Sequence, residues 1–203
     1  MRSRTATACA IAILSAAVAG AQATKKPPKR TDAEIAANVK AHKADFDYLL
    51  GQWKFSAVSK QYGKFEGLWT AMKLPGGEIL DEYAILDGKG AKMYVSTTIR
   101  AYNAVLDQWE LIGTDEARGL HDFGSGHRTP GGFEIEQTFG VMSPEPSTWR
   151  IHYRNIKPDS FSWSADRTTD GGKTWVTDFQ TIEARRVAAA YDVAVFAPSP
   201  KRP

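Results

Sequence analysis

Two histidines on one strand-like run are the first side chains in this sequence that suggest chemistry. His121 and His127 fall on the same face of an extended run over residues 120–128, because successive side chains of a strand alternate between its two faces. Imidazole nitrogens bind a metal ion or heme iron at about 2 Å, but six residues of strand span about 20 Å. The pair could share an ion only if a bulge at an intervening glycine shortens the run. His152 of another run is an alternative partner for either one.

Charged side chains alternate with apolar ones on two other runs. Arg150, His152 and Arg154 share one face, which would form a cationic lining for a carboxylate or phosphate if it pointed inward. We favour the outward orientation, because half of the residues of such a sheet face water. Glu134 and Glu136 also share a face. Paired acids can serve general acid–base catalysis, but here we favour an exposed polar face.

Two patterns resemble catalytic motifs without their context. Ser125 stands between two glycines but lacks the Gly-x-Ser-x-Gly spacing and the strand–turn–helix of a nucleophile elbow. Residues 168–175 match the Asp-box pattern of sialidase-type propellers, yet the pattern occurs once and a propeller needs a copy in each blade. We interpret it as a hairpin turn in which Asp170 accepts hydrogen bonds from local amides. The sequence therefore assigns no catalytic residue, metal ligand or cofactor. An enzyme that uses His121, His127, His152 and Glu136 stays an alternative.

The N-terminal segment has the pattern of a secretory signal peptide. Arg2 and Arg4 precede a stretch of small and apolar residues over 5–21, and Ala21-Gln22-Ala23 fits the small-x-small cleavage site. The apolar stretch is short for a membrane-spanning helix of about 20 residues. We therefore expect a signal peptide over residues 1–23 and export to the periplasm or out of the cell, with no membrane span in the mature form. An uncleaved anchor is the alternative.

Cleavage after residue 23 changes the charge balance and the cysteine content. It removes Arg2 and Arg4, two of the 26 basic residues, and none of the 23 acidic residues, so the mature chain has a net charge of +1. A nearly neutral chain has no global field that would favour nucleic acid. Cleavage also removes Cys9, the one cysteine of the sequence, which excludes a cysteine nucleophile, a thiolate metal site and a disulfide scaffold.

The mature chain is expected to form one domain between two flexible ends. Residues 24–31 are basic, contain two prolines and predict a flexible linker. Residues 32–187 predict the folded domain. Residues 188–203 predict a C-terminal tail that ends in a proline-rich segment.

A short helix is predicted at the start of this domain. Thr31 and Glu34 form a capping-box pattern, which predicts a helix over residues 32–44. Ile35 and Val39 recur at helical spacing and form a narrow apolar stripe. We expect this stripe to lie across one end of the structure that follows.

From Trp53 onward the apolar pattern changes from helical to alternating spacing. Runs joined by short turns, without crossover helices, predict an antiparallel sheet, and closure would remove the two edges that an open sheet exposes. We therefore predict an antiparallel up-and-down β-barrel of eight to ten strands, wide enough to hold a small ligand. The strand-like runs cover residues 53–58, 65–72, 79–86, 92–102, 109–114, 120–128, 133–139, 148–156, 161–166 and 174–186.

Three motifs, taken in order, resemble a known family. They are Phe46-Asp47-Tyr48-Leu49-Leu50-Gly51-Gln52-Trp53 at the first run, Ala101-Tyr102-Asn103 before Trp109, and Asp170-Gly171-Gly172-Lys173-Thr174-Trp175 before the last strand. Over residues 44–187 the chain resembles small bacterial lipocalin-like proteins that are grouped as a domain of unknown function.

This resemblance implies a calycin-type barrel, in which a tryptophan of the first strand packs beneath a basic residue near the C-terminus. By position, Trp53 takes the first role, and Arg185 or Arg186 takes the second. An Arg guanidinium stacked on an indole contributes about 0.5–2 kcal/mol. The pair is therefore expected to close the barrel and to perform no chemistry.

The expected function is noncovalent binding of a small, partly apolar or amphipathic molecule inside the barrel. Barrels of this size leave an interior lined by alternate residues, and the sequence is rich in aromatic residues. The candidate lining residues are aromatic or imidazole side chains of the strand-like runs: Trp69, Tyr83, Tyr94, Trp109, His121, His127, Phe133, Trp149, His152 and Trp163. The alternatives are an envelope interaction module with a filled barrel and the enzyme considered above.

Overall fold

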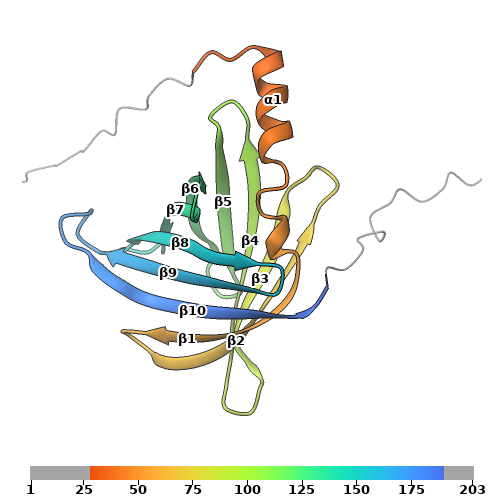
Figure 1. The fold of residues 1–203 in the computed structure, drawn as a ribbon. Coiled ribbons are helices and arrows are strands. Elements are labelled where there is room, and N and C mark those ends of the chain that lie inside the picture. The colour runs from red at the N-terminus through yellow and green to blue at the C-terminus, as the bar shows by residue number, and fades with distance from the viewer. Residues whose placement is uncertain (1–27, 190–203) are drawn as a thin grey trace, which may run out of the picture.

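Ten antiparallel strands close into one barrel (Figure 1). The computed structural model describes residues 28–189. The predicted up-and-down barrel with a short N-terminal helix is confirmed, at the upper end of the expected strand number. The predicted signal peptide, the start of the linker and most of the tail lie outside the described residues. The elements are α1 (Asp32–His42), the 3-10 turn η1 (Asp47–Leu49), β1 (Gly51–Ser59), β2 (Gly63–Lys73), β3 (Ile79–Leu86), β4 (Lys92–Asn103), β5 (Gln108–Asp115), β6 (Gly119–Thr129), β7 (Gly132–Phe139), β8 (Ser147–Lys157), β9 (Ser160–Thr168) and β10 (Val176–Ala188).

Consecutive strands pair side by side, and the last strand returns to the first. β1 pairs with β2 on one side and with β10 on the other, so the sheet has no edge. Each of the ten predicted runs overlaps one strand, with boundaries that differ at the turns. β10 begins at Val176 rather than at residue 174, because the Asp170 carboxylate accepts hydrogen bonds from the amide and the hydroxyl of Thr174. Those bonds hold the preceding segment in a turn.

Arg186, and not Arg185, is the basic residue that packs on Trp53. Its guanidinium carbon lies 4.1 Å from the centre of the Trp53 ring, which is fully buried. The same guanidinium donates to the backbone carbonyls of Tyr48, Leu50 and Pro158. Arg185, its neighbour on β10, is exposed. Arg186 therefore ties the last strand to the segment that enters the first strand.

The helix is attached to the barrel by polar contacts. The predicted capping box is present, since the Glu34 amide donates to Thr31 Oγ1 and the Glu34 carboxylate accepts from the Thr31 amide. The expected apolar docking stripe is wrong: α1 has no buried residue, and Val39 is 43% exposed. Asn38 Nδ2 instead donates to the carbonyl of Ala104 in the β4–β5 turn, at 2.9 Å. Within residues 28–189, neither helical segment is long and apolar enough to cross a membrane.

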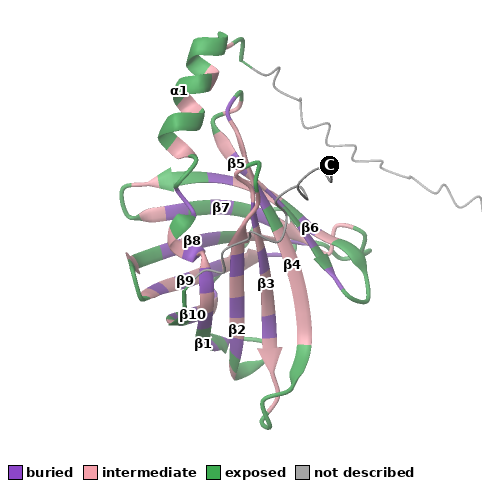
Figure 2. Cartoon of the chain, turned by 90° about the vertical axis from the view of Figure 1, so that its right-hand side faces the viewer, coloured by how far each residue is buried: buried purple, intermediate pink, exposed green. Residues whose placement is uncertain are grey.

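Aromatic side chains fill the end of the barrel next to α1. Phe46, which follows α1 in the chain, is fully buried and stacks on Phe133 at a centroid distance of 4.1 Å. It also meets Trp109 edge-on at 4.9 Å, and Trp53 meets Phe161 edge-on at the same distance. Figure 2 shows how buried and accessible positions alternate along β2 and β3. We call this part of the interior, defined by these five residues, the filled half.

One ion pair is buried beside these rings. Arg100 Nε donates to the Asp81 carboxylate at 2.6 Å, and both side chains are almost fully buried. Trp69 Nε1 donates to the same carboxylate at 2.8 Å. Burial acts to lower the pKa of Arg100, but the charge and hydrogen bond of Asp81, together with Tyr153 and Tyr48, outweigh burial and raise this pKa above its ordinary value. Arg100 therefore stays charged inside the barrel.

Candidate ligand-binding site

Inward-facing side chains remain accessible in the part of the barrel farther from α1. On β4, Tyr94, Ser96 and Thr98 alternate in step with Arg100, and they therefore face the interior with it. Arg100 is 3% exposed, whereas these three are only partly buried. Trp149 on β8 is also partly buried, although it lies on the inner face with the buried Ile151. We call this part of the interior the open half; its inner wall is formed by Tyr83, Tyr94, Ser96, Thr98, Gly124 and Trp149.

Aromatic rings form two walls of the open half. Tyr83 stacks on Phe55 at a centroid distance of 4.9 Å, with 15° between the ring planes. On the β8 side, Trp149 contacts Phe139 at 5.0 Å and meets Phe179 edge-on at 5.1 Å. Pairs with such geometry contribute about 0.5–1.5 kcal/mol beyond the area that they bury. The rings are thus held in place and present flat apolar surface to the interior.

Two tyrosine hydroxyls add polar groups to these walls. Burial raises the pKa of Tyr83 and of Tyr94 above the ordinary value, because desolvation penalises the phenolate. Both hydroxyls are therefore protonated at neutral pH. The Tyr83 hydroxyl is buried beside the side chain of Gln180, whose hydrogen bond acts to lower the pKa but does not outweigh burial.

A second polar group is built around Asp122 on β6. Its carboxylate is 3.1 Å from Nδ1 of His121 and accepts a hydrogen bond from Gln137 Nε2. Asp122 itself is only 2% exposed. A Cβ at Gly113, the residue that pairs with Asp122 across β5 and β6, would overlap this carboxylate. The glycine therefore makes the space in which the acid is buried.

Asp115 lies beside this group at the end of β5. Burial acts to raise its pKa, but hydrogen bonds from the side chain and amide of Arg118, with the His121 ring nearby, outweigh burial. The pKa of Asp115 consequently lies below its ordinary value. Arg118 Nη1 donates to the carboxylate at 2.8 Å. Both acids of this region are thus occupied by protein donors.

The predicted aromatic lining residues are divided between the two parts of the interior. Tyr83, Tyr94 and Trp149 lie in the open half, where they are partly accessible. The other four are buried in the packed core: Trp69, Trp109, Phe133 and Trp163. About half of the aromatic candidates therefore form packing rather than accessible wall.

The structure does not bring the predicted histidines together. His121 leans toward Asp122, next to a register shift between β5 and β6. His127 is exposed near the α1 end of the barrel. His152 lies on the outer face, where its Nδ1 is 3.9 Å from Glu134. Within residues 28–189, no group of three His, Cys, Asp or Glu side chains could hold a metal ion.

The charged faces point outward, as the sequence interpretation favoured. Arg150 and Arg154 are exposed on β8, and Glu134 and Glu136 are exposed on β7. Arg150 also lies over the Trp175 ring, with 3.9 Å between the guanidinium carbon and the ring centre. Neither face lines the interior, so the set of His121, His127, His152 and Glu136 forms no common site.

Sequence reasoning missed the polar residues of the interior. Asp81 and Asp122 interrupt or adjoin apolar runs and carry no motif that marks them as inward-facing. Their burial depends on cross-strand partners: Arg100 for Asp81, and Gly113 and Gln137 for Asp122. A usable signal for a buried acid would have been a charged residue that shares one face of a strand with apolar residues. Asp81 shares its face with Ile79 and Tyr83 in this way.

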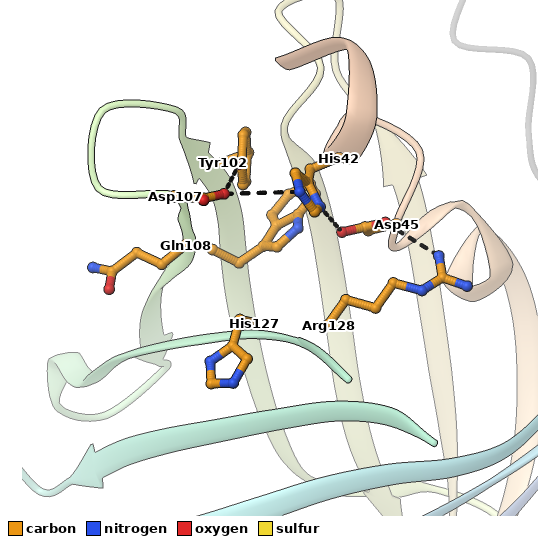
Figure 3. Close-up of a pocket in the computed structure, with 8 residues that line it drawn as sticks. His42, Asp45, Tyr102, Asp107, Gln108, His127 and Arg128 are labelled. Atoms are coloured by element: carbon orange, nitrogen blue, oxygen red, sulfur yellow. Dashed lines mark hydrogen bonds and ion pairs between the residues drawn. The ribbon is translucent and has the colours of Figure 1, made fainter. Parts of the chain in front are cut away.

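A separate pocket lies at the seam between α1 and the barrel (Figure 3). It has a volume of about 250 Å³ and lies among residues from the end of α1, the β4–β5 turn and the end of β6. His127 and Trp109 are the two predicted candidates that line it. We call it the seam pocket.

Comparison with known proteins supports the fold. No family model matches the sequence, and no curated protein matches it. Among solved structures, Rv2717c from M. tuberculosis superposes with a TM-score of 0.53 and 17% identity, covering 73% of this chain and 96% of that chain. Two designed barrels are also similar. A redesigned β-barrel, mFAP1, bound to DFHBI gives a TM-score of 0.37 and 10% identity over 70% of this chain and 98% of its own. EF1p2_mFAP2b bound to DFHBI gives a TM-score of 0.34 and 15% identity over 71% of this chain and 98% of its own. The likeness is one of fold, a lipocalin-like β-barrel.

Proposed function

We propose that this chain is a binding protein that holds a small, partly apolar molecule in the open half of its barrel. The observation that carries the proposal is the accessible surface of Tyr94, Ser96 and Thr98 on the inner face of β4. Protein interiors are close-packed and leave few voids larger than a water molecule. Inward-facing side chains that stay accessible therefore indicate space that a ligand can occupy.

The walls of the open half indicate the kind of ligand. The rings of Tyr83 and Trp149 favour a flat apolar portion, since such pockets are lined mainly by aromatic and apolar groups with a few polar ones. The hydroxyls of Ser96 and Thr98 favour one polar group on that ligand. Asp115 and Asp122 are already paired, so they do not require a cationic ligand.

The test is a pair of substitutions at adjacent positions of β4. Ser96→Trp places an indole inside the barrel, and Thr97→Trp places the same indole on the outer face. An apolar fluorescent dye is titrated into the wild type and both variants. We expect one dye per wild-type chain, affinity at least about tenfold weaker in Ser96→Trp, and unchanged affinity in Thr97→Trp. Urea unfolding of each variant checks that the barrel is intact.

Two outcomes would count against the proposal. The first is the absence of stoichiometric binding by the wild type across a broad set of dyes. The second is equal binding by Ser96→Trp and Thr97→Trp when both variants are folded, because the dye would then be outside the barrel.

We also propose that the protein is exported. The support is the signal-peptide pattern of residues 1–23. The measurement is the intact mass of the chain purified from the cell envelope or the medium, which is expected to begin at residue 24. A full-length chain that is recovered with the membrane would support the anchor alternative instead.

One observation favours the alternative of an interaction module. Ile99, Ile112 and Phe123 are paired across β4, β5 and β6 on the outer face, and they are 44%, 53% and 59% exposed. Adjacent exposed apolar side chains are typical of protein interaction surfaces. If a second copy of the chain covers this stripe, sedimentation velocity would show a dimer in the wild type and a monomer in Ile112→Ser. A wild-type monomer at all concentrations would exclude that self-association.

A further inference from the structure

The seam pocket is separate from the open half and has its own set of polar groups (Figure 3). His42 at the end of α1 stands between two acids: its Nδ1 is 2.9 Å from Asp45, and its Nε2 is 3.7 Å from Asp107. The His42 ring also lies against Tyr102 at a centroid distance of 5.2 Å. These contacts join the end of the helix to the barrel at the pocket.

The two carboxylates of the pocket are already occupied. Asp45 is 5% exposed and accepts from Arg128 Nη1 at 3.1 Å as well as contacting His42. Asp107 accepts from the Tyr102 hydroxyl at 2.6 Å and from Arg30 Nη2 at 3.3 Å. A ligand with a positive charge would have to displace these donors, so the acids do not favour a cation.

The groups that remain free are hydrogen-bond donors. Trp109 is 1% exposed, and its indole N–H is buried without a hydrogen-bond partner among the described residues. An unpaired buried donor is unfavourable, and a bound acceptor would satisfy it. Arg128 is 57% exposed, and one of its nitrogens, Nη1, donates to Asp45. His127 is exposed and forms no ion pair or hydrogen bond within the described chain.

The walls of the pocket are aromatic. Tyr102 and Trp109 lie with ring centroids 5.6 Å apart, and Trp109 is backed by Phe46. The volume of about 250 Å³ is below the range of about 300–1,000 Å³ that drug-sized ligands occupy. It suits a molecule with one ring and one short polar group.

We propose that the seam pocket binds a small aromatic carboxylate, with its ring against Trp109 and Tyr102 and its carboxylate accepting from Arg128 and the Trp109 N–H. A guanidinium matches a carboxylate in charge and in hydrogen-bond geometry. His127 stands at the pocket as a further donor. This site does not depend on ligand binding in the open half, because the filled half separates the two.

The experiment is a benzoate titration followed by the indole N–H signals in two-dimensional proton–nitrogen NMR spectra. The chain has six tryptophans, and Trp109→Phe identifies the Trp109 signal by its loss. We expect benzoate to shift the Trp109 signal saturably. Benzamide has the same ring without the charge and is expected to bind about tenfold more weakly. Benzylamine, a cation with the same ring, is expected to cause no saturable shift.

Variants locate the carboxylate. Arg128→Gln is expected to weaken benzoate binding by about tenfold. Arg154→Gln, which changes an exposed arginine on the outer face of β8, is the matched control and should bind as the wild type does. If Arg128→Gln is unfolded because Asp45 loses a partner, His127→Gln changes an exposed side chain and should weaken binding several-fold. No saturable shift of Trp109, equal binding of benzylamine, or shifts confined to Trp149 would overturn the proposal.

Discussion

Arg186 makes more contacts than its neighbour Arg185, although the two have the same chemistry. Its guanidinium covers Trp53 and donates to the three backbone carbonyls of Tyr48, Leu50 and Pro158. Hydrogen bonds to charged groups contribute about 1.5–3 kcal/mol, and the cation–π contact about 0.5–2 kcal/mol. We therefore expect Arg186→Met to lower the free energy of unfolding by about 2–4 kcal/mol.

Arg185→Met is the matched control for this measurement. Arg185 is exposed, so its replacement should change the free energy of unfolding by less than about 0.5 kcal/mol. Urea denaturation of both variants gives the comparison. Equal losses in the two variants would show that Arg186 does not hold the barrel closed.

For the buried pair of Asp81 and Arg100, we predict that a single and a double replacement have opposite consequences for stability. Removing one partner leaves an uncompensated charge in the core, which costs about 3–5 kcal/mol. We expect Arg100→Met alone to cost that much, because Asp81 is almost fully buried. Replacing both residues, as Asp81→Leu with Arg100→Met, should recover most of the loss, since buried pairs exchange with apolar residues at little net cost. Chemical denaturation of the single and double variants tests this, and a double variant as unstable as the sum of its singles would contradict it.

At the scale of elements, the turn between β9 and β10 depends on one carboxylate. Asp170 accepts from the side chain and amide of Thr174 and from the Thr168 hydroxyl, and these hydrogen bonds hold its pKa below the ordinary value. A group with a depressed folded pKa contributes stability above its unfolded pKa of about 4, and this stability is lost as the pH falls toward the folded value.

The expected result follows from the downward shift of the Asp170 pKa. Asp170→Asn should lower the thermal midpoint at neutral pH, and the difference from wild type should shrink as the pH falls below about 4. Thermal melts of both proteins at neutral and acidic pH measure it. Comparing the two proteins removes the effect of other acids, such as Asp115, whose titration is common to both. A difference that stays constant down to low pH would show that the Asp170 charge is not involved.

The strands could be predicted from the sequence, but the docking of the helix could not. Alternation along runs such as β1 is enforced by the pleat, so Trp53 and Phe55 had to share the inner face. The stripe of Ile35 and Val39 is too narrow to hold α1 against the barrel by apolar packing, and Phe46 covers the barrel end instead. That choice depends on the three-dimensional fit of Phe46 among rings of distant strands, which no local pattern encodes.

Registers and bulges limited the prediction of the site. The choice between Arg185 and Arg186 needs the pairing of β1 with β10, in which Arg186 lies opposite Trp53 and Arg185 lies opposite Lys54. His121 was expected to lie on one face with His127, but the shift between β5 and β6 turns it toward Asp122. One extra residue in a strand changes which face a side chain occupies, and the sequence alone does not locate that residue.

At the scale of the whole molecule, the interior is divided between packing and accessible space. The filled half gathers Trp53, Trp109 and the rings around Phe46, which provide the buried apolar area that a single-domain barrel needs. The open half buries less apolar area, because its side chains Tyr94 and Trp149 remain partly accessible. Apart from Phe46, the residues that define the two halves lie on different strands, and the closed sheet holds these strands together. Stability and binding can therefore be changed separately at different residues.

This division predicts which tryptophans a solute can reach. Trp149 is partly accessible, whereas Trp53 is fully buried, so acrylamide should quench the first and not the second. Trp149→Phe is expected to lower the quenchable fraction of the fluorescence, and Trp53→Phe should leave the quenchable emission unchanged. A dye bound in the open half should protect Trp149 but not Trp175, which lies outside the barrel against Arg150. If quenching in Trp149→Phe equals that of the wild type, the end of the barrel far from α1 is as closed as the other.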